Sequence, residues 1–227
     1  MQITKNINDK IINIFYNESN KDKIPVIILN TYDEDGISIW KETNTNNYIL
    51  VTISNIDWNN DMSPWYMDKL YQSEDDYLGK ADEYLNLLTN SIISTITNII
   101  NNELHIEITE YIIAGYSLAG LFALYSIYKT NIFNKVISCS GSLWYPNFTN
   151  YVKENNYLNK PKKIYFSLGN KESNTKNELL KTVKDKTIEL VDHYKNIGID
   201  TIYEENIGNH FQDVTKRIAK GINWILK

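Results

Sequence analysis

Arginine is almost absent from this chain, because Arg217 is its single arginine and lysines supply the other positive charges. The formal net charge is −5 at pH 7, and no segment gathers lysines into a basic block. Phosphate backbones are bound by clustered Lys and Arg side chains. The sequence therefore argues against a nucleic-acid partner.

Cysteine is equally scarce, since Cys139 stands alone inside an apolar segment. A single cysteine excludes a disulfide within the chain, which fits a reducing compartment. The first ten residues contain no apolar signal core, and no run approaches the ~18 apolar residues of a membrane span. We therefore expect a cytoplasmic protein without a membrane partner.

Metal-binding and nucleotide-binding motifs are missing as well. The patterns CxxC, HExxH and GxGxxG and the P-loop do not occur in the sequence. The acidic run Asp33-Glu-Asp-Gly36 lacks the remaining ligands of a calcium loop, so a solvated turn is expected there. The sequence predicts no metal and no cofactor.

The chain does contain an alternation of strand-like and helix-like patterns, without a linker or an internal repeat. Its 227 residues fit one domain, residues 1–227. Strands are expected at 11–16, 24–30, 48–54, 111–115, 135–140, 163–168 and 199–205, and helices at 80–101, 118–129, 174–196 and 211–226. Several of the strands are unbroken apolar runs, which is typical of strands buried on both faces. We predict an α/β fold with a mostly parallel central sheet, helices on both faces and no large lid domain.

Residues 111–124, which read YIIAGYSLAGLFAL, have the pattern of a strand, a tight turn and a helix. Ser117 lies at the apex of this turn, with Gly115 two positions before it. Such a turn lifts the serine hydroxyl above the sheet at a helix N-terminus, and small residues are needed where strand and helix cross. The usual pattern is G-x-S-x-G, and this chain departs from it in having Ala119 at the last position, followed by Gly120. We predict that Ser117 is a nucleophile.

A serine nucleophile needs a base, and the chain offers only three histidines. His210 follows the last expected strand, which places it at the same sheet edge as Ser117. His105 precedes the nucleophile strand at the opposite edge, and His193 lies in an expected helix among polar neighbours. We predict that His210 is the base and that the other two lie at the surface. The alternative for His210 is a local hydrogen bond at a helix N-terminus.

The acid of the triad is expected after the strand at 163–168, where Glu172 is the only carboxylate in the loop. Glutamate is also favoured at the start of a helix by the helix dipole, so a capping or solvent-facing role is the alternative. Asp185 and Asp192, both in the following helix, are less well placed candidates. The order Ser117, Glu172, His210 is that of α/β hydrolases.

Two backbone N–H groups are expected to bind the oxyanion. Leu118 follows the nucleophile directly and supplies one of them. The loop after the strand at 24–30 supplies the other, from Thr31 or Tyr32. No glycine-rich signature marks this loop, so an ordinary exposed loop is the alternative.

Aromatic residues follow several of the expected strands. Trp58 and Trp65 lie in one loop, and Trp144 lies in the loop after Cys139. Together with Tyr116, the neighbour of the nucleophile, they are candidates to line a substrate pocket. The alternative is that these tryptophans simply cover the edge of the sheet.

These motifs resemble the putative esterase family of α/β hydrolases, the group that includes the ferric enterobactin esterases and esterase D. The resemblance lies in residues 115–125, 137–144, 169–172 and 208–210. It implies an α/β-hydrolase fold, with Ser117 as nucleophile, His210 as base, Glu172 as acid and no cofactor. The scarcity of arginine counts against a siderophore substrate, because a triscatecholate is strongly anionic and its planar recognition favours arginine.

The sequence thus predicts a serine hydrolase that cleaves carboxylic esters through an acyl-enzyme intermediate. Its partner is a small-molecule ester, either of the siderophore type or with a small acyl group. An acyltransferase, a thioesterase and a peptidase use the same triad, and they remain alternatives. So does a catalytically inactive, hydrolase-like binding protein. The sequence leaves the oligomeric state open.

Overall fold

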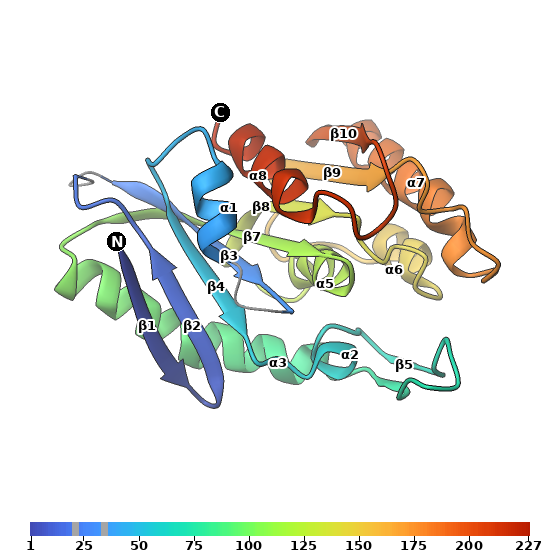
Figure 1. The fold of residues 1–227 in the computed structure, drawn as a ribbon, viewed down its shortest axis with the longest axis horizontal. Helices are drawn as coiled ribbons and strands as arrows, with labels where there is room; N and C mark the ends of the chain where they lie inside the picture. Colours follow the sequence, from blue (N-terminus) through green and yellow to red (C-terminus); the bar gives the residue numbers. More distant parts are fainter. Residues whose placement is uncertain (20–22, 33–35) are drawn as a thin grey trace.

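The computed structural model describes residues 1–19, 23–32 and 36–227 (Figure 1). Within these ranges eight strands form one central sheet in the order β1-β2-β4-β3-β7-β8-β9-β10. The strands are β1 Gln2–Ile7, β2 Lys10–Phe15, β3 Ile24–Asn30, β4 Ile49–Ser54, β7 Ile108–Tyr116, β8 Phe133–Cys139, β9 Lys163–Gly169 and β10 Asp200–Asn206. The pairs β1–β2 and β2–β4 are antiparallel, and all the other pairs in the sheet are parallel. The prediction of a mostly parallel sheet is confirmed.

Helices connect most of these strands. The α-helices are α1 Gly36–Glu42, α2 Trp58–Asp61, α3 Ala81–Leu87, α4 Ile93–Asn98, α5 Leu118–Ser126, α6 Phe148–Glu154, α7 Val183–Asn196 and α8 Val214–Ile225. Two π-helical turns, Leu88–Ile92 and Ile99–Glu103, extend α3 and α4 into one helical path. Among the described residues, no helix combines the length and the apolar character needed to cross a membrane.

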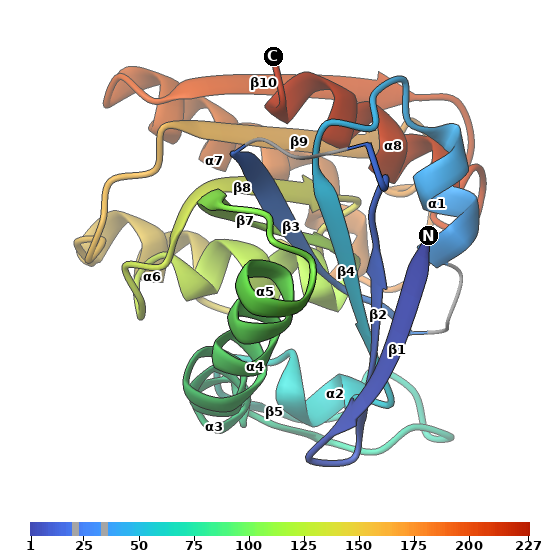
Figure 2. The ribbon, with the colours of Figure 1, turned by 90° about the vertical axis from the view of Figure 1, so that its left-hand side faces the viewer.

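The sheet is covered on both faces, because side chains of a strand alternate between its two sides. On β3, Ile27 and Leu29 pack in one core with residues of α1 and α8. Val26 and Ile28, which alternate with them, pack in a second core with residues of α3, α4, α5 and α7. Figure 2 shows α1 and α8 on one side of the twisted sheet and α3 to α5 on the other.

The segment at 55–80 is small. It contains α2 and a short hairpin of β5 Tyr66–Met67 and β6 Tyr77–Leu78. In the part of the chain that the structure describes, no lid domain covers the sheet edge, as predicted. The acidic run at 33–35, for which we expected a solvated turn, lies outside the described residues.

Several elements differ from the prediction. The short helices α1, α2 and α6 and the β5–β6 hairpin were not expected, and α8 begins at Val214 and not at residue 211. Strand β1 was not expected, since its alternating polar residues lie at the open edge of the sheet, half-buried or exposed. Helix α7 begins at Val183 and not at residue 174. The reason is local, because Asn177 Oδ1 accepts hydrogen bonds from the N–H groups of Leu179 and Leu180 and holds this stretch in a turn.

Candidate active site

Ser117 lies in a tight turn between β7 and α5. Its backbone has φ 58° and ψ −125°, a strained conformation for a residue with a side chain. The turn is fastened to the neighbouring strand, because Ser117 N–H donates to Cys139 O over 3.1 Å. Ser142 N–H donates in turn to Ser117 O over 3.0 Å. The serine is therefore presented at the carboxyl edge of the sheet, as the sequence predicts.

The small residues around Ser117 explain how strand and helix cross. A Cβ on Gly115 would overlap the backbone carbonyl of Ala119, so this position requires glycine. Ala119 itself is fully buried, and its methyl group packs in the core under α5. The alanine at the last position of the motif is therefore accommodated, and the close approach is provided by Gly115.

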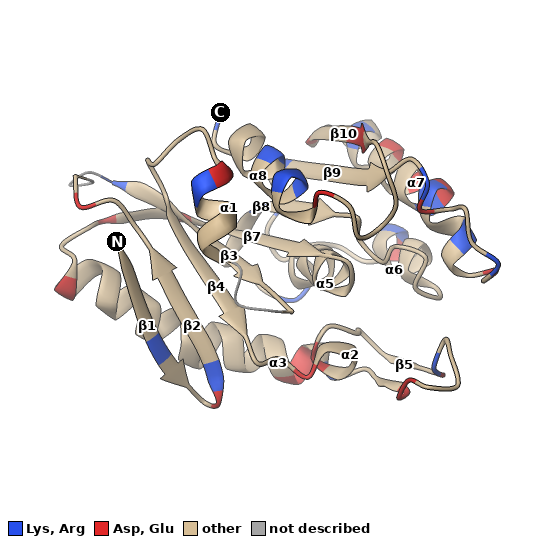
Figure 3. Cartoon of the chain, in the orientation of Figure 1, with Lys and Arg blue, Asp and Glu red and all other residues tan. Residues whose placement is uncertain are grey.

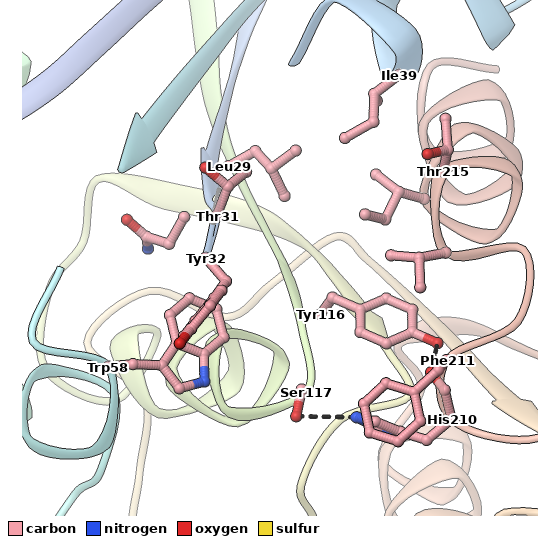
Figure 4. Close-up of a pocket in the computed structure, with 13 residues that line it drawn as sticks. Leu29, Thr31, Tyr32, Ile39, Trp58, Tyr116, Ser117, His210, Phe211 and Thr215 are labelled. Atoms are coloured by element: carbon pink, nitrogen blue, oxygen red, sulfur yellow. Dashed lines mark hydrogen bonds between the residues drawn. The ribbon is translucent and has the colours of Figure 1, made fainter. Parts of the chain in front are cut away.

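The structure brings together the three residues predicted as nucleophile, base and acid. His210 Nε2 lies 3.0 Å from Ser117 Oγ (Figure 4). His210 Nδ1 lies 2.7 Å from Glu172 Oε2. The serine follows β7, the glutamate follows β9 and the histidine follows β10. All three strands are parallel, so their carboxyl ends meet at one edge of the sheet.

The other candidates for base and acid lie elsewhere. His105 is exposed in the loop before β7, and His193 is half-buried within α7. Asp185 and Asp192 are exposed on α7. Among the described residues, none of these four forms a hydrogen bond with Ser117 or with the base predicted for it.

The carboxylate of Glu172 is held through both of its oxygens. Oε1 accepts hydrogen bonds from Gly169 N–H (2.6 Å), from the Ser140 hydroxyl (2.7 Å) and from Arg217 Nη1 (2.9 Å). Oε2 faces His210. Burial raises the pKa of Glu172, but the hydrogen bond and charge of His210, with the bonds from Ser140 and Gly169, outweigh it and hold this pKa below its usual value. The site thus keeps a charged carboxylate behind the imidazole.

Arg217 of α8 is the functional-site residue that the sequence analysis missed. Its side chain is 1% exposed. Nη1 donates to Tyr116 Oη over 3.0 Å, while Nη2 donates to the carbonyls of Ile207 (3.2 Å) and Asn209 (2.9 Å). Tyr116 Oη donates in turn to His210 O over 2.7 Å. The single arginine therefore ties the acid to the loop that carries the histidine, and its rarity in the composition was the one available signal.

The loop after β3 contains the two candidates for the second oxyanion donor. Thr31 N–H donates to Ile53 O over 2.9 Å as part of the sheet, so the prediction of Thr31 as a donor is wrong. Tyr32 comes next and lines a cavity together with Ser117. Among the described residues, the N–H groups of Tyr32 and Leu118 have no hydrogen-bond acceptor. Both N–H groups are thus free donors within the described part of the chain.

Three of the four predicted pocket aromatics lie beside Ser117. Trp58 of α2 packs edge-on against Tyr32, with ring centroids 5.5 Å apart. The ring of Tyr116 lies against His210 at 5.3 Å. Trp144 lines a second cavity next to the serine. These three rings therefore line the cavities that contain Ser117.

Trp65 is the exception. Its indole Nε1–H donates to Pro146 O over 3.1 Å, and its ring packs among Tyr145, Phe148 and Tyr151. It lines neither of the cavities that contain Ser117. The prediction of Trp65 as a substrate-binding residue is therefore wrong, because the tryptophan covers the sheet edge, as the alternative had it.

Two cavities meet at Ser117 and His210. The first has a volume of about 410 Å³ and lies between the end of β3, α1 and α8 (Figure 4). The second has a volume of about 470 Å³ and lies over the loops that follow β8 and β9. Both volumes fall in the range of about 300–1,000 Å³ that is usual for small-molecule sites. In the described part of the chain, no group of three or more His, Cys, Asp or Glu side chains is arranged to hold a metal ion.

The fold is shared with solved serine hydrolases. It is similar to an IroE-like serine hydrolase from Shewanella oneidensis, with a TM-score of 0.81 and 15% identity over 100% of this chain and 80% of that one. It is also similar to the siderophore hydrolase EstA from Aspergillus nidulans, with a TM-score of 0.74 and 15% identity over 99% and 92% of the two chains.

The sequence is also similar to a known protein and to the model of a protein family. An uncharacterized protein of Bacillus subtilis (strain 168), YbbA, is 25% identical over 169 residues, which are 72% of this chain and 67% of the relative. The model of the family described as "Putative esterase" matches residues 15–212, which is most of the chain. The chain belongs to this family of α/β hydrolases and is a serine ester hydrolase.

Proposed function

We propose that Ser117, His210 and Glu172 are the catalytic triad of this esterase. The observation that carries the proposal is the unbroken chain of hydrogen-bonding distances, 3.0 Å from serine to histidine and 2.7 Å from histidine to glutamate. A serine, a base and an acceptor that fixes the base are the three parts that such a nucleophile needs. The arrangement also gives no support to the alternative of a broken triad kept for binding alone.

The reaction follows from these positions. His210 Nε2 accepts the proton of the hydroxyl while Ser117 Oγ bonds to the ester carbonyl carbon. The N–H groups of Leu118 and Tyr32 donate to the oxyanion of the tetrahedral intermediate. The intermediate then releases the alcohol, which takes the proton from His210 and leaves an acyl-serine. His210 next removes a proton from water as the water oxygen attacks the acyl carbonyl. The bond between this carbon and Ser117 Oγ then breaks, the acid leaves, and His210 returns the proton to Oγ.

Glu172 and Arg217 have supporting parts in this scheme. Glu172 holds the Nδ1–H tautomer of His210 and stabilises the imidazolium that forms during each proton transfer. Arg217 donates hydrogen bonds to Glu172 Oε1 and to Asn209 O, and so holds the carboxylate and the loop that carries His210 in place. Burial raises the pKa of Tyr116 to about 12, so its hydroxyl stays protonated and keeps donating to His210 O.

The substrate is a small-molecule ester, and the place of action that we propose is the cytoplasm. The single cysteine supports a reducing compartment. Cys139 is buried at the end of β8, and burial raises its pKa to about 12, so this thiol does not compete as a nucleophile.

Substitution of Ser117 tests the proposal. Ser117→Ala is expected to lower kcat for p-nitrophenyl acetate by at least about 10⁴-fold and to abolish labelling by a fluorophosphonate probe. The matched control is Ser142→Ala, because Ser142 Oγ lies 3.4 Å from Ser117 Oγ but is not bonded to the imidazole. This control is expected to keep its labelling. Unchanged turnover by Ser117→Ala would contradict the assignment.

A further inference from the structure

The first cavity is lined by apolar and uncharged polar side chains, apart from the catalytic histidine that we propose. Its lining comes from β3 and the residues after it, from α1, from α2 and from the start of α8, and it opens at the Ser117 hydroxyl (Figure 4). The lining is aliphatic or aromatic at Leu29, Tyr32, Ile39, Trp58, Tyr116, Phe211, Val214 and Ile218. The remaining side chains besides serine and histidine are the neutral Asn30, Thr31 and Thr215.

This lining contains no Lys, Arg, Asp or Glu among the described residues. The cations on α8 are engaged elsewhere. Lys216 pairs with Asp213 at 3.5 Å, Lys220 pairs with Glu204, and Arg217 pairs with the buried triad carboxylate. Figure 3 shows these basic residues along α8. An anionic group that enters the cavity would therefore leave water without finding a charged partner among the described residues, which is costly.

The second cavity is different in character. Its lining includes the charged Glu74, Glu172 and Lys171 and the amides of Asn59, Asn174 and Asn209, alongside apolar side chains such as Leu70, Trp144 and Leu180. Its two carboxylates outnumber its single lysine, so this cavity does not favour a polyanion either. The two cavities thus offer the two sides of an ester different surroundings, one neutral and apolar and the other of mixed apolar, polar and charged character.

We propose that the first cavity binds an uncharged, largely apolar arm of the substrate, so that the enzyme hydrolyses neutral esters and not polyanionic ones such as a triscatecholate. The inference rests on the proposed function, since it assumes that the ester carbonyl lies at Ser117. Each methylene that enters an apolar cavity adds roughly fourfold to binding. The ester arm is selected by its apolar area, and a carboxylate at its end is rejected.

The first experiment compares esters of matched length. The substrates are p-nitrophenyl acetate, butyrate and hexanoate, with the mono-p-nitrophenyl ester of adipic acid as the charged counterpart of the hexanoate. We expect kcat/KM to rise along the neutral series and to fall by at least about 100-fold from the hexanoate to the adipate ester. A second series, acetate esters of ethanol, butanol and hexanol, shows whether the acyl or the alcohol arm enters the cavity.

Two variants show which cavity determines the preference for ester length. Val214→Phe fills the first cavity from the start of α8, and Leu180→Phe adds the same ring to the wall of the second. For the arm that enters the first cavity, Val214→Phe is expected to lower the six-carbon to two-carbon ratio of kcat/KM by about 10-fold or more. Leu180→Phe is expected to leave this ratio within about threefold. Val214→Lys adds a cation and is expected to raise the adipate to hexanoate ratio.

The outcomes of these experiments distinguish a failure of this inference from a failure of the proposed triad. Preferred hydrolysis of the adipate ester, or a ratio that changes in Leu180→Phe and not in Val214→Phe, would overturn the neutral-arm proposal. Labelling of Ser117 by the fluorophosphonate probe, measured in every variant, reports on the triad alone. Absence of labelling in the wild type would overturn the proposed function, and retained labelling with the wrong ester preference would overturn only the inference.

Discussion

Arg217 Nη1 donates a hydrogen bond to Glu172 Oε1 over 2.9 Å, and the side chains of this ion pair are only 1% and 3% exposed. The pair joins the last helix to the loop after β9, directly behind the histidine. Removal of one partner from a buried pair leaves an uncompensated charge in the interior, which is far more costly than the loss of a surface pair. The stability of the protein and the geometry of its proposed triad are therefore coupled through this contact.

Replacement of the arginine tests that coupling. Arg217→Met is expected to lower the free energy of unfolding by about 3–5 kcal/mol, because the carboxylate of Glu172 remains buried without its cation. It also removes the bonds to Ile207 O and Asn209 O, so kcat is expected to fall more than KM rises. Urea denaturation and steady-state hydrolysis of p-nitrophenyl butyrate measure the two effects.

The control for this variant is a cation of the same helix at the surface. Lys220→Met breaks an ion pair with Glu204 that is partly exposed, and it is expected to change stability by less than about 1 kcal/mol. Arg217→Lys keeps the positive charge but not the fork of donors, so an intermediate stability is expected. A variant Arg217→Met that unfolds at the wild-type urea concentration would rule out the coupling.

The lowered pKa of Glu172 predicts how stability depends on pH. The unfolded chain titrates this carboxyl near its ordinary value of 4.5, and the folded protein titrates it lower. The stabilisation that the charged form provides is therefore complete above about pH 4.5 and is lost as the pH falls through the folded-state pKa. The stability difference between wild type and Glu172→Gln should be large at pH 7 and should shrink below pH 4.5.

Urea unfolding of both proteins at several pH values between 7 and 3 measures this difference. Glu189→Gln is a useful comparison, because the pKa of Glu189 is lowered mainly by a hydrogen bond from Lys153 in a solvent-exposed position. Its contribution should be much smaller at every pH. A wild-type advantage over Glu172→Gln that grows as the pH falls would be incompatible with the lowered pKa.

The second oxyanion donor is tested at Tyr32. Tyr32→Pro removes the backbone N–H and is expected to lower kcat by about 10²–10³-fold. Tyr32→Ala removes the ring but keeps the N–H, so its kcat is expected to stay much closer to that of the wild type. Steady-state kinetics with p-nitrophenyl acetate distinguish the two. Equal losses in both variants would mean that the ring, and not the amide, is what matters.

Two substitutions test the turn around Ser117. Gly115→Ala forces β7 and α5 apart, since its methyl group would overlap the backbone of Ala119, and it is expected to lower Tm and fluorophosphonate labelling together. Ala119→Gly restores the usual motif and is expected to keep labelling, at a cost of about 1 kcal/mol in helix propensity. A large gain in kcat for Ala119→Gly would show that the alanine methyl displaces the nucleophile.

Much of the site followed from local sequence patterns. The turn at Ser117 is encoded by residues next to it, and parallel strands bring their carboxyl ends to one edge, so Glu172 and His210 were found from the loops that they occupy. Trp65 satisfied the same rule and still failed, because its position after a strand end does not determine which way the indole faces. A hydrogen bond to Pro146, 81 residues away, holds it over the sheet edge, away from Ser117.

Arg217 was missed for a related reason. Its partners Glu172, Ser140 and Tyr116 lie 45, 77 and 101 residues away in the sequence, so no local pattern connects them. The start of α7 was misplaced by the opposite effect, since a short-range turn at Asn177 overrode an apolar spacing that suits a helix. Contacts between distant segments, and side-chain bonds to a nearby backbone, are the two kinds of information that periodicity does not contain.

The position of Arg217 on α8 has a consequence for biosynthesis. A nascent polypeptide emerges from the ribosome with its N-terminal part first, so Ser117, Glu172 and His210 are all translated before this helix is. Until α8 docks, Glu172 lacks its guanidinium and the histidine loop lacks two of its anchors. We expect partly translated chains to hydrolyse no cellular esters. The chain should become active only when α8 folds onto the sheet.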